Sequence, residues 1–245
     1  MPDSTPHGST PAGAHHDGAR HDDAARRGPG ARRRLVVTDV DSTFILQEVV
    51  ELLAEHAGTR EQVAEVTERA MRGELDFAAS LRARVATLAG LPVSVFDAVR
   101  DAVVLTPGAA ELVAGCRDRG WAFGLVSGGF AEIVEPLAAS LGITRVRANR
   151  LEVADGVLTG RTLGPVVDRR VKATTLRAWA DAEGVRIEDT VAVGDGANDL
   201  EMIAAAGVGI AFRAKPVVRA QAPWALDGRL DEVLDVVERA EAARV

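Results

Sequence analysis

The sequence has a single cysteine, Cys116, so an internal disulfide is excluded. Cys116 lies in a stretch whose apolar residues have helical spacing, and a buried thiol is its expected role. Disulfides are rare in proteins that remain in a reducing compartment. The cysteine usage therefore favours a reducing compartment.

The sequence also lacks a surplus of positive charge and a long apolar run. Its 36 acidic residues outnumber its 29 basic residues, which gives a formal net charge of -7. Nucleic acids and anionic membranes need a basic face, so we expect neither as a partner, although a small anionic substrate is compatible with a local positive site. No run is long enough to span a bilayer, and the polar N-terminus lacks the apolar core of a secretory signal. We expect a soluble, cytoplasmic protein, either a monomer or a homodimer.

Large apolar residues are nearly missing from residues 1–33, where Gly, Pro, Ala, His, Asp and Arg dominate. Such a segment buries too little surface to offset the entropy lost on ordering, so we expect a disordered N-terminal tail. Four of the five histidines lie in this tail, which leaves a metal-binding tract as an alternative to a solvated segment. They are His7, His15, His16 and His21.

The rest of the chain alternates short apolar runs with helix-like stretches, and 47% of all residues are hydrophobic, enough for one sizeable core. This alternation predicts an α/β fold: a doubly wound, mostly parallel, Rossmann-like sheet. Alternation around Asp155-Gly156 predicts a β-hairpin over residues 151–159. Four runs are predicted to be buried strands: 35–39, 121–126, 190–194 and 208–212. The predicted helices between them cover residues 109–119, 131–141, 172–183 and 199–205.

Residues 44–105 have no convincing strand and show helical spacing throughout. Four helices inserted directly after the first strand predict a lid over the end of that strand. We therefore expect an α/β core domain made of residues 34–43 and 106–245, with a helical cap domain over residues 44–105. The four predicted cap helices cover residues 47–56, 60–72, 77–88 and 92–103.

Polar residues follow three of the predicted strands. Asp39-Val40-Asp41-Ser42-Thr43 follows the first, Ser127-Gly128-Gly129 the second, and Gly194-Asp195-Gly196-Ala197-Asn198-Asp199 the third. Lys172 begins the helix predicted before the third strand. In an open parallel sheet, ligands bind beyond the carboxyl ends of the strands. Each group alone is also compatible with an ordinary turn, loop or solvated charge, but together they indicate one site.

The charges at this edge indicate phosphoryl transfer. Carboxylates crowded into one cleft repel unless a cation or a proton intervenes, and oxygen ligands without His or Cys favour Mg²⁺. Lys172 and the Ser127-Gly128-Gly129 segment can hold a phosphoryl group. Asp39 can then attack phosphorus, and Asp41, with a raised pKa, can act as general acid and base. A simple loop or a calcium site is the alternative for the Asp pair.

These residues are similar to the four motifs of the haloacid dehalogenase (HAD) superfamily, and within it the chain resembles the phosphoserine phosphatase family. The likeness runs from about Arg34 to the C-terminal helix and includes the helical cap. Its most specific strings are DVDST at 39–43, the segment from Met71 through LDFAASLRARV, VSGGF at 126–130, ANRL at 148–151, DGVLTG at 155–160 and VAVGDGANDLEM at 191–202. Val40 departs from the family, which usually has Phe there, but this residue offers mainly its backbone, so we expect little loss.

The resemblance implies a role for each matched residue. Asp39 would be the nucleophile and Asp41 the general acid and base. Asp39, the backbone carbonyl of Asp41 and Asp195 would hold Mg²⁺, with Asp199 supporting the metal site. The phosphoryl group and the substrate would be held by Ser127, Gly128, Lys172 and Asn198.

The resemblance assigns substrate choice to the cap. Glu48 would pair with the amino group of the substrate and Arg84 with its carboxylate, while Met71 and Phe77 would line the pocket. Arg has the planar fork that suits a carboxylate, and a zwitterionic head needs one anion and one cation. The alternatives are that Glu48 complements a helix N-terminus, that Arg84 is a solvated helix charge, and that Met71 and Phe77 are cap core.

The implied activity is Mg²⁺-dependent hydrolysis of O-phospho-L-serine to serine and phosphate through an aspartyl-phosphate, the last step of serine biosynthesis. Two alternatives keep the same site: a phosphotransferase, and a phosphatase for another small phosphomonoester. A non-catalytic phosphate-binding module is a third alternative, although the intact set of Asp39, Asp41, Lys172 and Asp195 argues against it. The family resemblance supports the substrate more strongly than the residues alone do.

Overall fold

The computed structural model describes residues 33–71 and 74–243, which belong to one compact unit. The predicted N-terminal tail lies outside the described residues, apart from its last residue. None of the helices that the structure describes has the length and apolar character needed to cross a bilayer.

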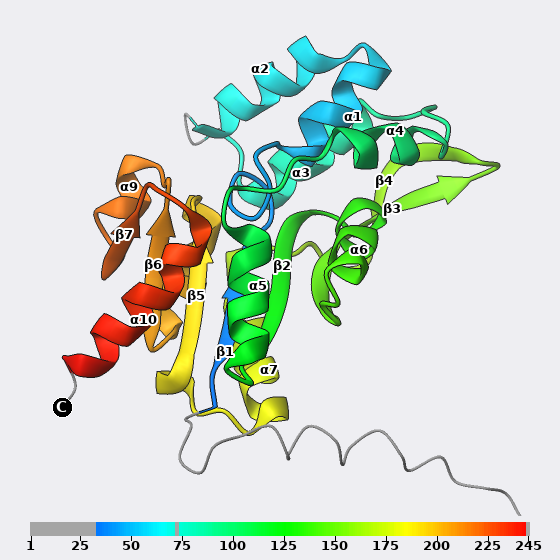
Figure 1. The fold of residues 1–245 in the computed structure, drawn as a ribbon. Coiled ribbons are helices and arrows are strands. Elements are labelled where there is room, and N and C mark those ends of the chain that lie inside the picture. The colour runs from blue at the N-terminus through cyan, green and yellow to red at the C-terminus, as the bar shows by residue number, and fades with distance from the viewer. Residues whose placement is uncertain (1–32, 72–73, 244–245) are drawn as a thin grey trace, which may run out of the picture. The chain divides into compact units, whose positions relative to one another are not determined.

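A seven-stranded sheet forms the centre of this unit, with the strand order β4-β3-β2-β1-β5-β6-β7 (Figure 1). All neighbouring strands are parallel except β3 and β4, which are antiparallel. The predicted doubly wound, mostly parallel sheet is therefore confirmed. The strands are β1 (Leu35–Thr38), β2 (Ala122–Phe130), β3 (Arg145–Ala154), β4 (Val157–Leu163), β5 (Thr190–Gly194), β6 (Val208–Phe212) and β7 (Trp224–Leu226).

Helices connect the strands. Five of the described helices lie between β1 and β2, and the first four of them fall within residues 44–105: α1 (Val49–Ala57), α2 (Arg60–Met71), α3 (Phe77–Ala86) and α4 (Val95–Ala102). The others are α5 (Ala109–Asp118), α6 (Ala131–Ser140), α7 (Arg169–Glu183), α8 (Leu200–Ala205), α9 (Pro216–Arg219) and α10 (Val233–Ala242). Short 3₁₀ turns cover Ile187–Asp189, Ala197–Asp199 and Leu230–Glu232.

Strand β1 shows why the sheet is buried on both faces. Successive side chains of a strand point to opposite faces. Val36 joins the cluster that includes α5, α6 and α10, whereas Leu35 and Val37 join the cluster with Leu176 of α7. Every residue of β1 is buried, as expected of a parallel strand covered by helices on both sides.

The hairpin predicted at Asp155-Gly156 is confirmed. Ala154 pairs with Val157, and the two residues between them have φ values of 51° and 76°. Two successive positive φ values give a turn whose twist matches that of the strands, which explains the Asp-Gly pair.

The predicted boundaries of two elements that carry site residues are wrong. Strand β2 continues through Phe130, so Ser127-Gly128-Gly129 belongs to the strand and not to a loop. Its pairing with β3 shifts register between Val126 and Phe130. Helix α7 starts at Arg169, one turn before Lys172, because the Asp168 side chain accepts a hydrogen bond from the Val171 amide and caps the helix.

Helices α1 to α4 gather beyond one end of the sheet (Figure 1). The chain enters and leaves this segment side by side, because Ile45 forms an antiparallel bridge with Leu105. The segment also contacts β4, where the amide of Leu158 donates to the carbonyl of Leu91. The division of the unit into a core and a cap domain stays a prediction.

Candidate active site

The first cluster of polar residues begins where β1 ends. The amide of Asp39 donates to the carbonyl of Val193 in β5 at 2.9 Å, so the parallel pairing of β1 and β5 extends to this residue. The buried Val40 turns the chain, because its carbonyl accepts from the amides of Thr43, Phe44 and Ile45. Val40 thus acts through its backbone at the position where the sequence departs from the family.

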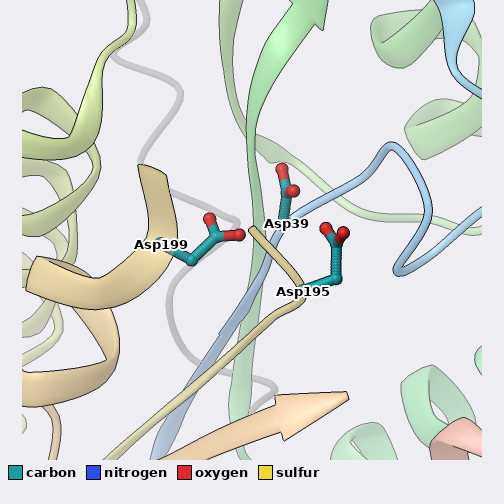
Figure 2. A group of neighbouring side chains, drawn as sticks. All are labelled: Asp39, Asp195 and Asp199. Carbon is teal, nitrogen blue, oxygen red and sulfur yellow. The ribbon is translucent and has the colours of Figure 1, made fainter. Parts of the chain in front are cut away.

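Three carboxylates meet at this edge of the sheet. Asp39, Asp195 and Asp199 each offer an oxygen, and these oxygens all lie within 4.8 Å of one another. Figure 2 shows the three side chains converging from the end of β1 and from the segment that follows β5. All three are buried. Hard oxygen ligands in this arrangement are able to hold a metal ion.

Lys172 lies between two of these carboxylates. Its Nζ donates to Oδ1 of Asp39 and to Oδ1 of Asp199, both at 2.6 Å. Burial alone would lower the pKa of Lys172, but Asp199 and Asp39 together raise it above its ordinary value. Lys172 therefore carries its charge at neutral pH.

One ammonium does not balance three carboxylates. Burial, and then the charge of Asp199, raise the pKa of Asp39 well above its ordinary value, despite the contact with Lys172. Burial and Asp199 also raise the pKa of Asp195 to about 6. Burial is the larger cause of both pKa shifts, and the repulsion from Asp199 adds to it; a bound cation would relieve this repulsion. The donor set and its charge therefore fit a metal ion.

Asp199 differs from the other two carboxylates in its hydrogen bonds. Its Oδ1 accepts from Lys172, and its Oδ2 accepts from the Gly196 amide at 3.0 Å. Both oxygens are already engaged, as expected of a residue that supports a metal site from outside. Asp195 is contacted at Oδ1 by the Thr43 hydroxyl at 3.4 Å.

Asp41 lies outside this group of three carboxylates, and its side chain is half-buried. Burial in its surroundings and the charge of Glu48 raise the pKa of Asp41 to about 8. The amide of Val49, at the start of α1, points to its Oδ1 at 3.4 Å and opposes this shift. A carboxyl group with this pKa keeps its proton at neutral pH and is able to donate it.

Ser127 and two glycines form the next part of the site. The Gly129 amide donates to Oγ of Ser127 at 2.8 Å, which occupies an acceptor position and leaves the hydroxyl proton for another partner. A Cβ on Gly129 would lie 2.5 Å from Oδ2 of Asp41 and 3.0 Å from Oγ of Ser127. A side chain at position 129 would therefore displace the carboxylate of Asp41 from its place beside Ser127.

Asn149 belongs to the site, although the sequence motifs did not predict it. Its Nδ2 donates to the carbonyl of Gly128 at 2.8 Å, and its Oδ1 accepts from the Val167 amide at 2.8 Å. These two hydrogen bonds join the end of β2 to the segment just before α7, the helix of Lys172. The Asn149 side chain that makes them is 2% exposed. The string ANRL was a signal of family only, and an isolated Asn in a strand predicts no such bridge.

The helical segment reaches the same edge through Phe77. A Cβ on Gly128 would lie 2.9 Å from Cζ of Phe77 and 3.7 Å from Nδ2 of Asn198. Phe77, the first residue of α3, therefore lies against the Ser127-Gly128-Gly129 segment. Met71 ends α2, and its side chain lies outside the described part of the structure.

Glu48 and Arg84 belong to two different helices, α1 and α3. Glu48 is the N-cap residue of α1, but its side chain makes no capping hydrogen bond. Its Oε1 accepts from the Ser42 hydroxyl at 2.7 Å. Arg84, in the last turn of α3, is half-buried; burial lowers its pKa, while the nearby charges of Glu48 and Asp41 oppose the shift. The two residues therefore lie near Asp41, on the side of the site that faces the helices.

Comparison with known proteins gives the family. Residues 36–204 match the model of the haloacid dehalogenase-like hydrolases. The chain is 55% identical to phosphoserine phosphatase SerB2 of Mycobacterium tuberculosis over 203 residues, which are 82% of this chain and 50% of the relative. It is 52% identical to a phosphoserine phosphatase of Streptococcus thermophilus over 205 residues, 83% of this chain and 95% of the relative.

A solved structure agrees with these relatives. The phospho-aspartyl intermediate analogue of a phosphoserine phosphatase has a TM-score of 0.78 and 40% identity, covering 83% of this chain and 98% of that one. The chain spans about half the length of the Mycobacterium relative and nearly all of the Streptococcus relative. By its matched model, its relatives and its fold, the chain belongs to the haloacid dehalogenase-like hydrolase family.

Proposed function

We propose that the chain is a Mg²⁺-dependent phosphatase that hydrolyses O-phospho-L-serine to serine and phosphate. The observation that carries this proposal is the contact of Lys172 with both Asp39 and Asp199 beside Asp195. A buried cation among several carboxylates at the ends of parallel strands suits a phosphoryl group and a metal ion. The names of the relatives support phosphoserine as the substrate.

In the proposed reaction, a carboxylate oxygen of Asp39 attacks the phosphorus atom. The bond between phosphorus and the serine oxygen breaks, and the leaving oxygen takes the proton of Asp41. Asp41, now ionised, then removes a proton from a water molecule, whose oxygen attacks the phosphorus of the acyl phosphate. The bond between phosphorus and the Asp39 oxygen breaks, so that phosphate leaves, Asp39 is again a carboxylate and Asp41 is again protonated.

Other residues hold the group that is transferred. Lys172 neutralises charge on Asp39 and on a phosphoryl oxygen. The free hydroxyl proton of Ser127 and the amide of Gly128 donate to the phosphoryl oxygens. Asp39, the backbone carbonyl of Asp41 and Asp195 would hold Mg²⁺, with Asp199 in support. When bound, Mg²⁺ supplies positive charge that offsets the charge on the phosphoryl oxygens.

The helical segment would supply recognition of the amino acid. Glu48 offers a carboxylate to the amino group, and Arg84 offers its guanidinium to the carboxylate. Two features support these roles: Glu48 does not cap its own helix, and the hydrogen bond that Arg84 donates from its Nε goes to the carbonyl of Ser80, at 3.4 Å, and not to a carboxylate. Phe77 and Asn198 lie against Gly128, where they would contact bound substrate, and Met71 would line the same pocket.

Phosphate release from a panel of phosphomonoesters tests this proposal. The panel contains O-phosphoserine, the phosphate ester of 3-hydroxypropanoate, which lacks only the amino group, and O-phosphoethanolamine, which lacks only the carboxylate, each with Mg²⁺ and with a chelator. We expect O-phosphoserine to react at least about 10-fold faster than either analogue, and the chelator to abolish the reaction. Equal rates on all three esters, or activity that survives chelation, would contradict the proposal. Labelled phosphate appearing on an added alcohol would instead identify a phosphotransferase.

A further inference from the structure

Ser42 has an unusual backbone for its residue type. Its φ is 57°, in the left-handed region that side chains with a Cβ rarely adopt. Its amide donates to the carbonyl of Gln47 at 3.2 Å, which closes the loop between β1 and α1. This closure brings Ser42 beside Glu48, six residues later in the chain. Unfavourable backbone conformations persist where the surroundings hold them in place, and they are frequent at functional sites.

The side chain of Ser42 has a defined partner in this loop. Its hydroxyl Oγ donates a hydrogen bond to Oε1 of Glu48 at 2.7 Å. Glu48 occupies the N-cap of α1 without bonding the amides of that helix. The orientation of the Glu48 carboxylate is therefore fixed by Ser42 and not by the helix N-terminus.

This hydrogen bond uses one oxygen of Glu48 and leaves the other for a ligand. A free glutamate side chain loses several rotatable bonds when it binds a cation, and this entropy loss weakens binding. Holding Glu48 in place beforehand removes part of that cost. Arg84 is the nearby cation, and its Nε donates to the carbonyl of Ser80 at 3.4 Å and not to Glu48.

We propose that Ser42 is a positioning residue that presents Glu48 to the amino group of the substrate. In this role the Ser42 side chain binds neither the phosphoryl group nor the metal ion, and it acts through Glu48. The inference rests on the proposed function, in which Glu48 receives the amino group. It predicts that loss of the Ser42 hydroxyl impairs recognition of the amino group more than it impairs phosphoryl transfer.

The test compares Ser42→Ala with the unchanged protein on O-phosphoserine and on the phosphate ester of 3-hydroxypropanoate, which lacks only the amino group. Alanine keeps the Cβ, so the backbone conformation carries the same penalty in both proteins. We expect the ratio of kcat/KM for the two esters to fall about 3- to 10-fold, chiefly through KM for O-phosphoserine, which corresponds to the net contribution of one ordinary hydrogen bond. For an ester that reacts too slowly, its inhibition constant against O-phosphoserine gives the same comparison.

Two further variants separate positioning from a structural role. Ser42→Gly also lacks the hydroxyl but takes a positive φ without penalty, so it should show the same change in ratio with a Tm at or above that of the unchanged protein. If Ser42→Ala fails to fold, Ser42→Gly is compared with the unchanged protein in its place. In a Glu48→Ala background, adding Ser42→Ala should change the ratio by less than about 2-fold, because the residue through which Ser42 acts is gone.

The outcomes that overturn the inference are specific. Equal losses on both esters in Ser42→Ala and Ser42→Gly would make the role of Ser42 structural. A ratio at the level of the unchanged protein would exclude any role in recognition, while the proposed function would stand. An unchanged protein without activity on O-phosphoserine would overturn the proposed function and this inference with it.

Discussion

Nζ of Lys172 lies 2.6 Å from Oδ1 of Asp39, although the two residues are 133 positions apart in the sequence. The same nitrogen lies 2.6 Å from Oδ1 of Asp199. A buried charge is costly unless it is paired, and this lysine is paired twice. One oxygen of Asp39 is thereby held by Lys172, which leaves the other oxygen for the proposed attack on phosphorus.

Asp39→Asn should abolish turnover, because an amide is a poor nucleophile and forms no acyl phosphate. We expect kcat for O-phosphoserine to fall at least about 1000-fold, measured by phosphate release. Asp101→Asn, on the exposed side of α4, is the matched control and should keep the activity of the unchanged protein. Substantial activity in Asp39→Asn would exclude the covalent step.

Removal of metal should make stability depend on pH. In the metal-free protein, burial and Glu48 raise the pKa of Asp41 to about 8, and burial and Asp199 raise that of Asp195 to about 6, from an ordinary 3.8. A raised folded-state pKa contributes stability below the unfolded-state pKa, and this contribution is lost as the pH rises through the folded-state value. The Tm of chelator-treated protein should therefore fall from about pH 5 to about pH 8.

Added Mg²⁺ should reverse this loss, because metal and protons compete for the same carboxylates. The rise in Tm on adding Mg²⁺, measured by calorimetry, should be larger at about pH 8 than at about pH 6. Of Asp41 and Asp195, Asp41 has the higher pKa, about 8. Asp41→Asn removes this titrating group and should therefore make Tm depend less on pH near pH 8. A Tm that is constant from pH 6 to pH 8 without metal would show that these carboxyl groups do not titrate there.

Arg84→Lys should alter substrate choice. Lysine keeps the charge but loses the planar fork that matches a carboxylate, so kcat/KM for O-phosphoserine should fall about 10- to 100-fold. O-phosphoethanolamine has no carboxylate, and its kcat/KM should fall much less. Arg82→Lys, an exposed neighbour on the same helix, is the control. Parallel losses on both esters would remove Arg84 from carboxylate recognition.

Asn149→Leu should destabilise the fold. The substitution leaves the carbonyl of Gly128 and the amide of Val167 without their partner in a site that is 2% exposed. We expect the free energy of unfolding to fall by about 2 to 4 kcal/mol, measured in urea. Asn149→Asp keeps the acceptor for Val167 and loses only the donor, so its loss should be smaller unless the carboxylate stays ionised. Equal stability of Asn149→Leu and the unchanged protein would contradict the bridge.

Cys116 should resist alkylation in the folded protein. It is fully buried, and burial raises the pKa of its thiol to about 12, so the reactive thiolate is scarce. Iodoacetamide at about pH 8 should label the native chain at least about 100-fold more slowly than the urea-unfolded chain, because the buried thiol reacts only when the structure opens locally. Mass spectrometry measures the extent of labelling over time. Rapid labelling of the native protein would show that α5 opens readily.

Much of the fold was predictable because its signals are local. Apolar runs predicted β1, β5 and β6, and the Asp155-Gly156 pair predicted the hairpin. Strand β7 was missed because Trp224–Leu226 is too short to show a pattern, and it forms only where β6 offers an edge. The end of β2 was also missed, since glycines weaken the strand signal and the pairing there depends on a register shift.

The sequence by itself determined which chemical groups are present and that Asp39, Ser127 and Asp195 fall near the ends of strands. Tertiary structure decided which of those groups touch. The two bonds of Lys172 require α7 to pack against β1, and the bridge of Asn149 requires β3 to pair with β2. The pairing of Ser42 with Glu48 needs a left-handed serine that a closed loop maintains. Side-chain contacts over such separations follow from packing and register, which local patterns in a sequence do not contain.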